Sequence, residues 1–166
     1  VCTLFGIPVR LSYTWLPMFL IVLVILGQFL YPEVMKNTAT PLLAWVLAAV
    51  STALYFVSLV AHEIGHGVVA RRLGTHVRSV ELFMFGGVAH MVGYAQRPRD
   101  EVLLAGAGPA TTFALAALFS LIWLVLRFVF GLNEPVILVF EHAAEFNAIL
   151  LVFNVIPAYP LDGGRL

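Results

Sequence analysis

Three stretches of the chain lack Asp, Glu, Lys and Arg over a length that can cross a lipid bilayer. They are residues 11–32, 37–61 and 102–126. Each meets or exceeds the roughly 20 residues that a transmembrane helix requires. A fourth apolar stretch covers residues 135–157, although two glutamates and a histidine interrupt it near its start. With 61% hydrophobic and 11% charged residues, the chain lies far from soluble proteins and is expected to sit in the bilayer.

The apolar stretches predict an all-α, multi-pass membrane protein with four transmembrane helices. The expected helices cover residues 13–31, 42–73, 102–127 and 135–157. Between the second and third helices, residues 76–96 hold two short strand-like runs on either side of Gly86 and Gly87, which predicts a membrane-associated β-hairpin with these glycines at its turn. This connection is too short for an inserted soluble domain, so we expect residues 1–166 to form a single core.

The basic residues fall mainly on one side of the expected helices. That side carries Arg10, Arg71, Arg72, Arg78, Arg97, Arg99 and Arg165, whereas the other carries only Lys36 and Arg127. Because cytoplasmic loops of membrane proteins are rich in Lys and Arg, this distribution places both termini in the cytoplasm. The net charge of zero gives no electrostatic case for a nucleic-acid partner. The lone cysteine, Cys2, excludes an intrachain disulfide and a thiolate-rich metal site.

The segment "AHEIGHG" places polar residues inside the second apolar stretch. His62 and His66 are four residues apart, so on a helix they share one face and both imidazoles can reach one ion. Glu63 is rotated by about 100° from His62 and lies beside that face. A charge at the centre of a bilayer costs roughly 2.5–3.5 kcal/mol. This cost favours metal ligation over a histidine pair that only contacts neighbouring helices.

A catalytic zinc needs a third protein ligand, and Asp162 is the candidate. The second and fourth helices are both expected to run towards the cytoplasm, which brings Asp162 to the membrane face that His62 and His66 occupy. Taken alone, Asp162 is more typical of an Asp-Gly turn at a helix end. Glu141 and Glu145 lie at the opposite end of the fourth helix and are poorer ligand candidates.

Glycines surround these polar residues. Gly65 and Gly67 are unfavourable in a helix relative to alanine, and they predict that another backbone or a substrate comes close to the histidines. Gly106 and Gly108 open the third helix among alanines, a composition that predicts close packing between membrane helices.

Two motifs of the chain resemble the signatures of a known family. "AHEIGHG" and, near the C-terminus, "FNVIPAYPLDGGR" resemble H-E-x-x-H and N-x-x-P-x-x-P-L-D-G of the site-2 proteases, a family of intramembrane zinc metalloproteases. "ELFMFGGV" is similar to the membrane-dipping hairpin of that family. The resemblance covers residues 42–166 and is to the compact prokaryotic branch, which lacks an inserted PDZ domain. Family chains usually continue with further helices, so we expect C-terminal helices to be missing from this chain.

This resemblance implies a zinc metalloendopeptidase with one Zn²⁺ per chain. Its implied substrate is a transmembrane protein that is cut in or near its membrane helix, as in regulated intramembrane proteolysis, with the active site nearer the cytoplasmic face of the cell membrane. The implied site residues are His62, His66 and Asp162 for zinc, Glu63 as catalytic acid and base, Asn154 for substrate orientation or oxyanion stabilisation, and Gly86 and Gly87 for substrate binding.

A zinc transporter or metal-sensing membrane protein is the alternative. Glu141, His142 and Glu145 near the far side of the membrane favour it weakly. A transport path needs ligands through the whole depth of the bilayer, whereas His62 and His66 lie at one level. The identity of the substrate and the formation of a homo-oligomer stay open at this stage.

Overall fold

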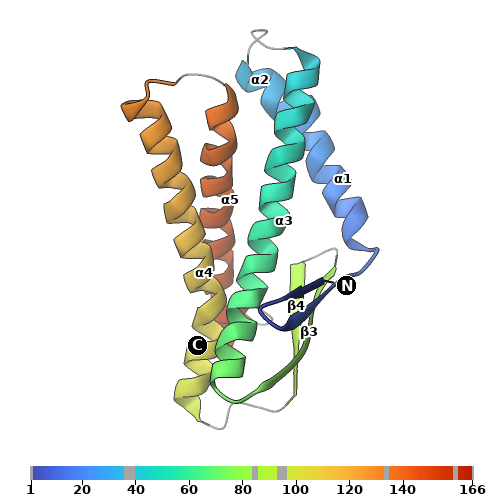
Figure 1. Ribbon diagram of the computed structural model, residues 1–166, viewed down its shortest axis with the longest axis vertical. Helices are drawn as coiled ribbons and strands as arrows, with labels where there is room; N and C mark the ends of the chain where they lie inside the picture. The colour runs from blue at the N-terminus through green and yellow to red at the C-terminus, as the bar shows by residue number, and fades with distance from the viewer. Residues whose placement is uncertain are drawn as a thin grey trace.

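Four helices of membrane-spanning length stand beside one another, and a small β-sheet lies against one end of them (Figure 1). The computed structural model describes residues 2–35, 40–83, 86–92, 97–132, 135–158 and 161–165. The spans are Trp15–Met35, Pro41–Arg72, Pro98–Val129 and Pro135–Val155, with mean hydropathies from 1.8 to 2.2. They confirm the expected multi-pass helical membrane protein.

The first span consists of α1 (Trp15–Ile25), a π-helical segment (Leu26–Leu30) and α2 (Tyr31–Met35). Its second half packs into a core at the end of the helices remote from the sheet. The buried residues of this core are Leu26, Tyr31, Met35, Ala44, Leu47, Ala48 and Val139. Small alanines on the next helix let the large side chains of the first span approach closely, as is usual between membrane helices.

The second span, α3 (Pro41–Arg72), is the helix that carries the histidines. Its start follows local rules, because Pro41 occupies the first turn and the Thr40 hydroxyl accepts a hydrogen bond from the amide of Leu43 at 3.3 Å. Its last turn holds Arg71 and Arg72, and Gly74 follows with φ of +81°. The long helix thus reaches from one end of the molecule to the sheet at the other (Figure 1).

The third and fourth spans complete the bundle. The third consists of α4 (Pro98–Leu124) and a π-helical segment (Val125–Val129). The fourth consists of a 3₁₀ turn (Pro135–Ile137) and α5 (Leu138–Val155), and a further 3₁₀ turn follows at Asp162–Arg165. Exposed apolar side chains cover the outside of the spans, as lipid contact requires; among them are Val57, Phe113, Leu121 and Val152.

The sheet has four strands in the order β1 (Cys2–Leu4), β2 (Ile7–Leu11), β3 (His76–Phe83) and β4 (Gly86–Val92). β3 and β4 form the expected antiparallel hairpin, and β2 pairs with β3 in parallel. The N-terminal strands were not predicted. Their pairing covers one edge of the hairpin, so β4 is one of the two end strands of the sheet that the described residues form.

The predicted place of the hairpin turn was wrong. Gly86 and Gly87 pair with Phe83 and Leu82, respectively, and are therefore the first two residues of β4. The connection itself falls at residues 84–85, outside the described residues. The Gly-Gly pair was read as a turn because glycine is typical of tight turns. In this fold, Gly87 has no side chain because β4 lies too close to Glu63 of α3 to leave room for one.

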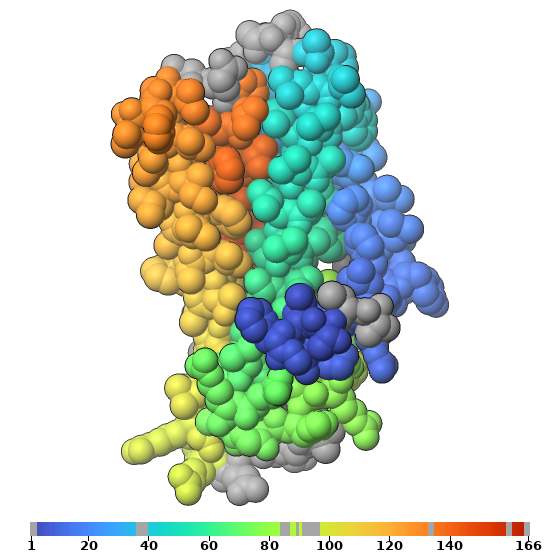
Figure 2. All heavy atoms as spheres, in the orientation of Figure 1, coloured from blue at the N-terminus to red at the C-terminus, as the bar shows by residue number. Residues whose placement is uncertain are grey.

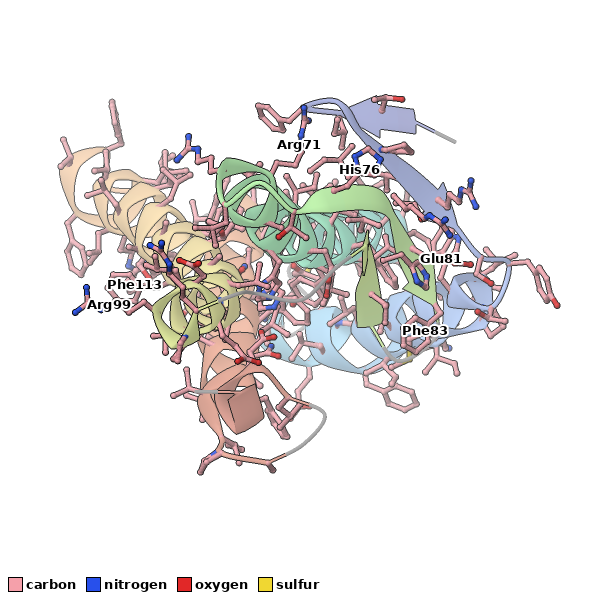
Figure 3. The ribbon with its side chains drawn as sticks, turned by 90° about the horizontal axis from the view of Figure 1, so that it is seen from below. Arg71, His76, Glu81, Phe83, Arg99 and Phe113 are labelled. Carbon is pink, nitrogen blue, oxygen red and sulfur yellow. The ribbon has the colours of Figure 1, made fainter. Side chains whose placement is uncertain are left out.

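The N-terminal strands lie over the lower part of α3 as drawn (Figure 2). A Cβ atom on Gly67 would lie 2.7 Å from Cδ1 of Ile7, which is fully buried. Seen from below (Figure 3), Arg71 points to the turn between β1 and β2, where its Nη1 donates a hydrogen bond to the carbonyl of Phe5 at 2.6 Å. Gly67 therefore admits a strand of the sheet beside the histidine helix.

Candidate metal centre

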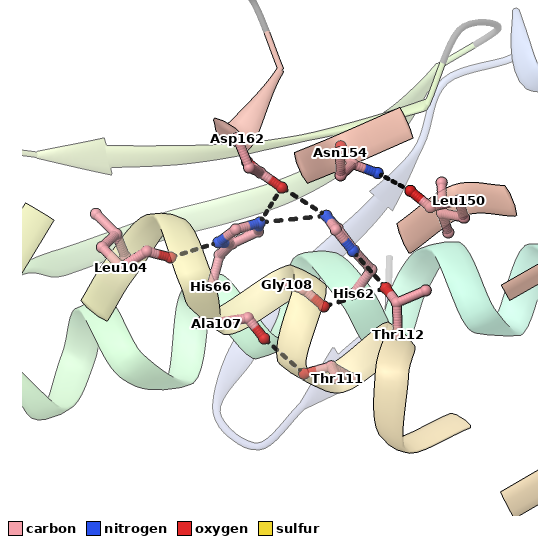
Figure 4. Close-up of polar contacts among 10 residues, drawn as sticks. All are labelled: His62, His66, Leu104, Ala107, Gly108, Thr111, Thr112, Leu150, Asn154 and Asp162. Atoms are coloured by element: carbon pink, nitrogen blue, oxygen red, sulfur yellow. Dashed lines mark hydrogen bonds and ion pairs between the residues drawn. The ribbon is translucent and has the colours of Figure 1, made fainter. Parts of the chain in front are cut away.

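Three side chains from two distant parts of the chain converge at the sheet end of α3 (Figure 4). Oδ2 of Asp162 lies 3.0 Å from Nε2 of His62 and 3.1 Å from Nε2 of His66, and the two Nε2 atoms are 3.2 Å apart. Both histidines are buried and Asp162 is half-buried. The predicted third ligand therefore meets the predicted histidine pair, and the three side chains are positioned to bind one metal ion.

The spacing of these three atoms fits zinc. Zinc binds nitrogen and oxygen ligands at about 2.0–2.2 Å in tetrahedral geometry, which sets ligand atoms about 3.3–3.6 Å from each other. The observed separations of 3.0–3.2 Å fall a few tenths of an ångström below this range. Only small movements of the side chains separate the described geometry from that of three zinc ligands.

The outer nitrogen atoms of the imidazoles fix which nitrogen faces the ion. Nδ1 of His66 lies 2.7 Å from the carbonyl oxygen of Leu104, which can only accept, so this Nδ1 carries a proton and donates it. Nδ1 of His62 lies 2.7 Å from Oγ1 of Thr112, whose own proton is donated to the carbonyl of Gly108 at 3.1 Å. Nδ1 of His62 therefore donates as well. In each neutral ring, Nε2 is left with a lone pair for a metal.

Asp162 owes its position to the break after α5. α5 ends at Val155, and a Cβ atom on Gly163 would lie 2.6 Å from the carbonyl oxygen of Ile156. Only glycine allows the following turn to fold so closely onto the helix end. The carboxylate is thus both part of an Asp-Gly turn and one of the three converging groups, so the two interpretations of the sequence are compatible.

The pKa of Asp162 reflects two opposing effects. Burial raises the pKa, but hydrogen bonds to His62 and His66 outweigh burial and hold the pKa below its ordinary value. Asp162 consequently stays ionised at neutral pH, as a metal ligand must be.

Gly108 of α4 provides the space in front of the imidazoles. A Cβ atom at this position would lie 2.5 Å from Nε2 of His62 and would collide with Nε2 of His66. Gly65 serves the expected close approach of helices, since its Cβ would lie 3.0 Å from the carbonyl oxygen of Ala107. Gly106 has nothing within 4 Å of such a Cβ atom. The expected close packing thus holds for Gly65, whereas Gly108 clears the metal site.

Glu63 lies between the metal group and the sheet. A Cβ atom on Gly87 would lie 2.7 Å from Cδ and 2.9 Å from Oε1 of Glu63. The first part of β4 therefore passes directly over the glutamate, and only glycine fits there. Gly86 precedes Gly87 as the first residue of β4 and pairs with Phe83.

Other predicted polar residues are not among the three converging ligands. The amide of Asn154 donates to the carbonyl of Leu150 within its own helix at 2.9 Å (Figure 4). His90 pairs with Glu81 at 3.4 Å on the exposed surface of the hairpin. Nδ1 of His142 lies 3.9 Å from Oε2 of Glu145. Glu141, His142 and Glu145, on which the transporter hypothesis depends, do not form a group of three metal ligands within the described part of α5.

The sequence did not identify Thr112 and the carbonyl of Leu104 as parts of the site. Their signal is a four-residue spacing on α4: Leu104, Gly108 and Thr112 share one face of the helix. This spacing becomes informative only when the face is known to oppose the histidines, which is a tertiary fact.

Comparisons with known proteins agree with this geometry. The model of peptidase family M50 matches residues 49–135. Among solved structures, the site-2 protease from Methanocaldococcus jannaschii is similar with a TM-score of 0.67 and 30% sequence identity, over 99% of this chain and 67% of that chain. The helical bundle with its small sheet is therefore the fold of a known site-2 protease.

Curated relatives point the same way. A Mycobacterium tuberculosis protein, provisionally named a zinc metalloprotease, is 44% identical over 124 residues, which are 74% of this chain and 31% of the relative. A zinc metalloprotease of Methanocaldococcus jannaschii is 33% identical over 162 residues, 97% of this chain and 42% of the relative. This chain spans less than half the length of these relatives, and their names agree with the predicted zinc cofactor. Because the family match covers more than half of its residues, this chain belongs to peptidase family M50, the family of the site-2 proteases.

Proposed function

We propose that this chain is an intramembrane zinc metalloendopeptidase and that residues 1–166 act as one catalytic core. Its substrate is a membrane protein, cut in or near a transmembrane helix. The observation that carries the proposal is the convergence of His62, His66 and Asp162, with Glu63 held beside them under an end strand of the sheet.

Zinc, when bound, supplies a Lewis acid that polarises the scissile carbonyl and acidifies water. Glu63 takes a proton from the attacking water as the oxygen bonds to the carbonyl carbon. The carboxyl group then returns this proton to the amide nitrogen as the C–N bond breaks. Because α3 fixes Glu63 one residue from His62, the acid–base group and the metal ligands move as one rigid unit.

Substrate binding is assigned to β4. A substrate helix hides its peptide bonds in its own hydrogen bonds, so a segment must unwind before it can be cut. β4 is an end strand of the described sheet, and an unwound segment can add to its edge. Gly87 faces Glu63, whereas the side chains of Val88 and His90 are exposed. A strand added beside Gly87 brings its peptide bonds to the catalytic carboxylate.

Asn154 is assigned to the substrate as well. A side-chain amide has two N–H donors, and one of them is used by the carbonyl of Leu150. The second is available for the oxyanion or for a substrate carbonyl. The half-buried position of Asn154 on α5, eight residues before Asp162, supports this assignment.

The orientation of the site follows the basic residues. Arg71 and Arg72 end α3 close to His66, and Arg97 and Arg99 flank the start of α4 at the same end of the bundle (Figure 1). The excess of positive charge at this end supports a site near the cytoplasmic face of the cell membrane.

The test is cleavage of a panel of single-span membrane peptides by the purified chain, with and without a chelator. Glu63→Gln is expected to keep zinc but to lose about 10²–10⁴-fold in rate, the usual contribution of general acid–base catalysis. Glu145→Gln is the matched control, because Glu145 also lies within a membrane span but outside the metal group. Undiminished cleavage by Glu63→Gln contradicts the proposal. Zinc flux into proteoliposomes without any cleavage would favour the transporter instead.

A further inference from the structure

α4 presents one stripe of three residues to the histidines, of which two accept hydrogen bonds and one leaves space. The carbonyl of Leu104 accepts from Nδ1 of His66, the hydroxyl of Thr112 accepts from Nδ1 of His62, and Gly108 between them leaves room for the ion. The stripe follows from the four-residue spacing, which places all three groups on one helix face. α4 contributes no metal ligand itself, yet it contacts both histidine ligands.

We propose that Thr112 is a positioning residue that holds His62 in the orientation and tautomer that bind the metal, and so sets the metal affinity of the site. This inference rests on the metal site of the proposed function. It concerns a residue that contacts neither the ion nor the substrate.

The hydrogen-bond network gives Thr112 this role. Its Oγ1 lies 2.7 Å from Nδ1 of His62, and both residues are buried. Its proton is directed to the carbonyl of Gly108 in the preceding turn, so the oxygen lone pairs face the imidazole. The side chain itself is held by its own helix, which fixes where the acceptor lies.

Loss of this acceptor has two costs for metal binding. A buried N–H without a partner carries a desolvation penalty. The ring of His62 can escape this penalty by moving its proton to Nε2, near Oδ2 of Asp162, but Nε2 then cannot bind a metal. In both cases, the free energy of metal binding becomes less favourable, because it includes the cost of the unpartnered N–H or of restoring the tautomer that binds the metal.

The two histidines differ in how far a side-chain substitution can affect them. His66 donates to a backbone carbonyl, which no substitution at Leu104 removes. His62 donates to a side chain. A substitution at Thr112 can therefore remove the hydrogen bond to the outer nitrogen of His62 while all three metal ligands keep their identity.

Thr111 is a built-in control. It precedes Thr112 on the same helix and also donates to a carbonyl four residues earlier, that of Ala107, at 2.9 Å. It packs against Gly65 of α3, not against an imidazole. Replacing either threonine with valine removes one hydroxyl from the α3–α4 contact and conserves the shape of the side chain. Only the change at Thr112 removes an acceptor from a histidine.

The experiment is a zinc competition titration of the purified chain with a fluorescent chelator. Thr112→Val is expected to weaken zinc binding by about 10–100-fold, as is typical for outer hydrogen-bond partners of metal-binding histidines. Thr112→Ser restores the hydroxyl and should restore the affinity, and Thr111→Val should match the wild type. The d–d absorption spectrum of the Co²⁺-loaded protein should change in Thr112→Val and revert in Thr112→Ser, which loss of packing alone does not produce.

Three outcomes overturn the inference: equal zinc affinity in Thr112→Val and wild type, equal loss in Thr112→Val and Thr111→Val, or no rescue by serine. If Thr112→Val does not fold, Thr112→Ala against Thr112→Ser gives the same comparison, since these variants differ by one hydroxyl group. A wild-type chain that binds no zinc would instead refute the metal site of the proposed function.

Discussion

Two groups of polar side chains lie along α3, and they differ in how their atoms are arranged. The metal group is His62, His66 and Asp162. The distal polar cluster, defined as Tyr31, Ser51, Ser58, His142 and Asn147, begins at Ser58, one helical turn before His62, and extends towards the other end of the bundle. There the hydroxyl groups of Tyr31 and Ser51 lie 2.5 Å apart, and the amide of Asn147 donates to Ser58 at 3.0 Å.

The two groups differ in whether their polar atoms converge on one point. In the metal group, three potential ligand atoms face one point, and the outer nitrogen of each imidazole is held by α4. In the distal polar cluster, hydrogen bonds join side chains in pairs across two helices. The ring of His142 stacks on Tyr31 at 5.7 Å, and neither of its nitrogens has a hydrogen-bond partner within the described residues. Buried polar residues in a membrane helix therefore indicate a metal site only when their atoms meet; otherwise they join helices.

Removal of a metal ligand should have the largest effect on zinc binding and so test the contrast between the two groups most strongly. Asp162→Ala is expected to lower zinc affinity by more than the 10–100-fold of an outer hydrogen-bond partner, because one of three protein ligands is lost. The measurement is zinc content per chain after dialysis against a weak chelator. Asp100→Ala, which changes the other aspartate of the chain, should keep its zinc. Full zinc content in Asp162→Ala would show that Asp162 is a turn residue and not a metal ligand.

Adding a methyl group at Gly108 should cause the second-largest loss of zinc affinity. Gly108→Ala places a carbon atom 2.5 Å from Nε2 of His62, in the space where an ion must lie, so we expect a large loss of zinc affinity by chelator competition. Gly106→Ala is the matched control, since nothing lies within 4 Å of a Cβ atom at that position. If both variants bind zinc like the wild type, Gly108 does not clear the site.

The distal polar cluster should respond in the opposite way. Ser58→Ala removes the hydrogen bond to Asn147, and polar contacts between membrane helices contribute about 0.6 kcal/mol on average, up to about 1.7. We therefore expect a small fall in thermal stability of the detergent-solubilised protein and unchanged zinc affinity. Ser120→Ala on α4 serves as the control for the loss of a serine hydroxyl. A loss of zinc in Ser58→Ala would show that the two groups are coupled.

Local sequence determined the helices and half of the site. Four apolar stretches are each long enough to cross the bilayer, and a helix is the structure in which one such stretch satisfies all its backbone hydrogen bonds by itself. The bounds expected for the second helix, residues 42–73, agree with α3 at Pro41–Arg72 because a proline and paired arginines mark its ends. The pairing of His62 with His66 follows from the helical repeat alone.

Contacts between distant segments decided the rest. β1 and β2 were missed because three- and five-residue strands give little signal until they pair with β3. Gly86 and Gly87 were placed at the turn because sequence cannot say that Gly87 faces Glu63. Thr112 looked like any threonine of a membrane helix before α4 was set against α3.

The sequence by itself therefore determined the membrane spans, the histidine pair and the glutamate beside it, since each depends on spacing along one helix. Only the tertiary structure decided that the carboxylate of Asp162 reaches both imidazoles, and that α4 holds their outer nitrogens. Those arrangements join residues that are between 38 and 100 positions apart in the chain, and no local periodicity encodes the packing of one helix against another.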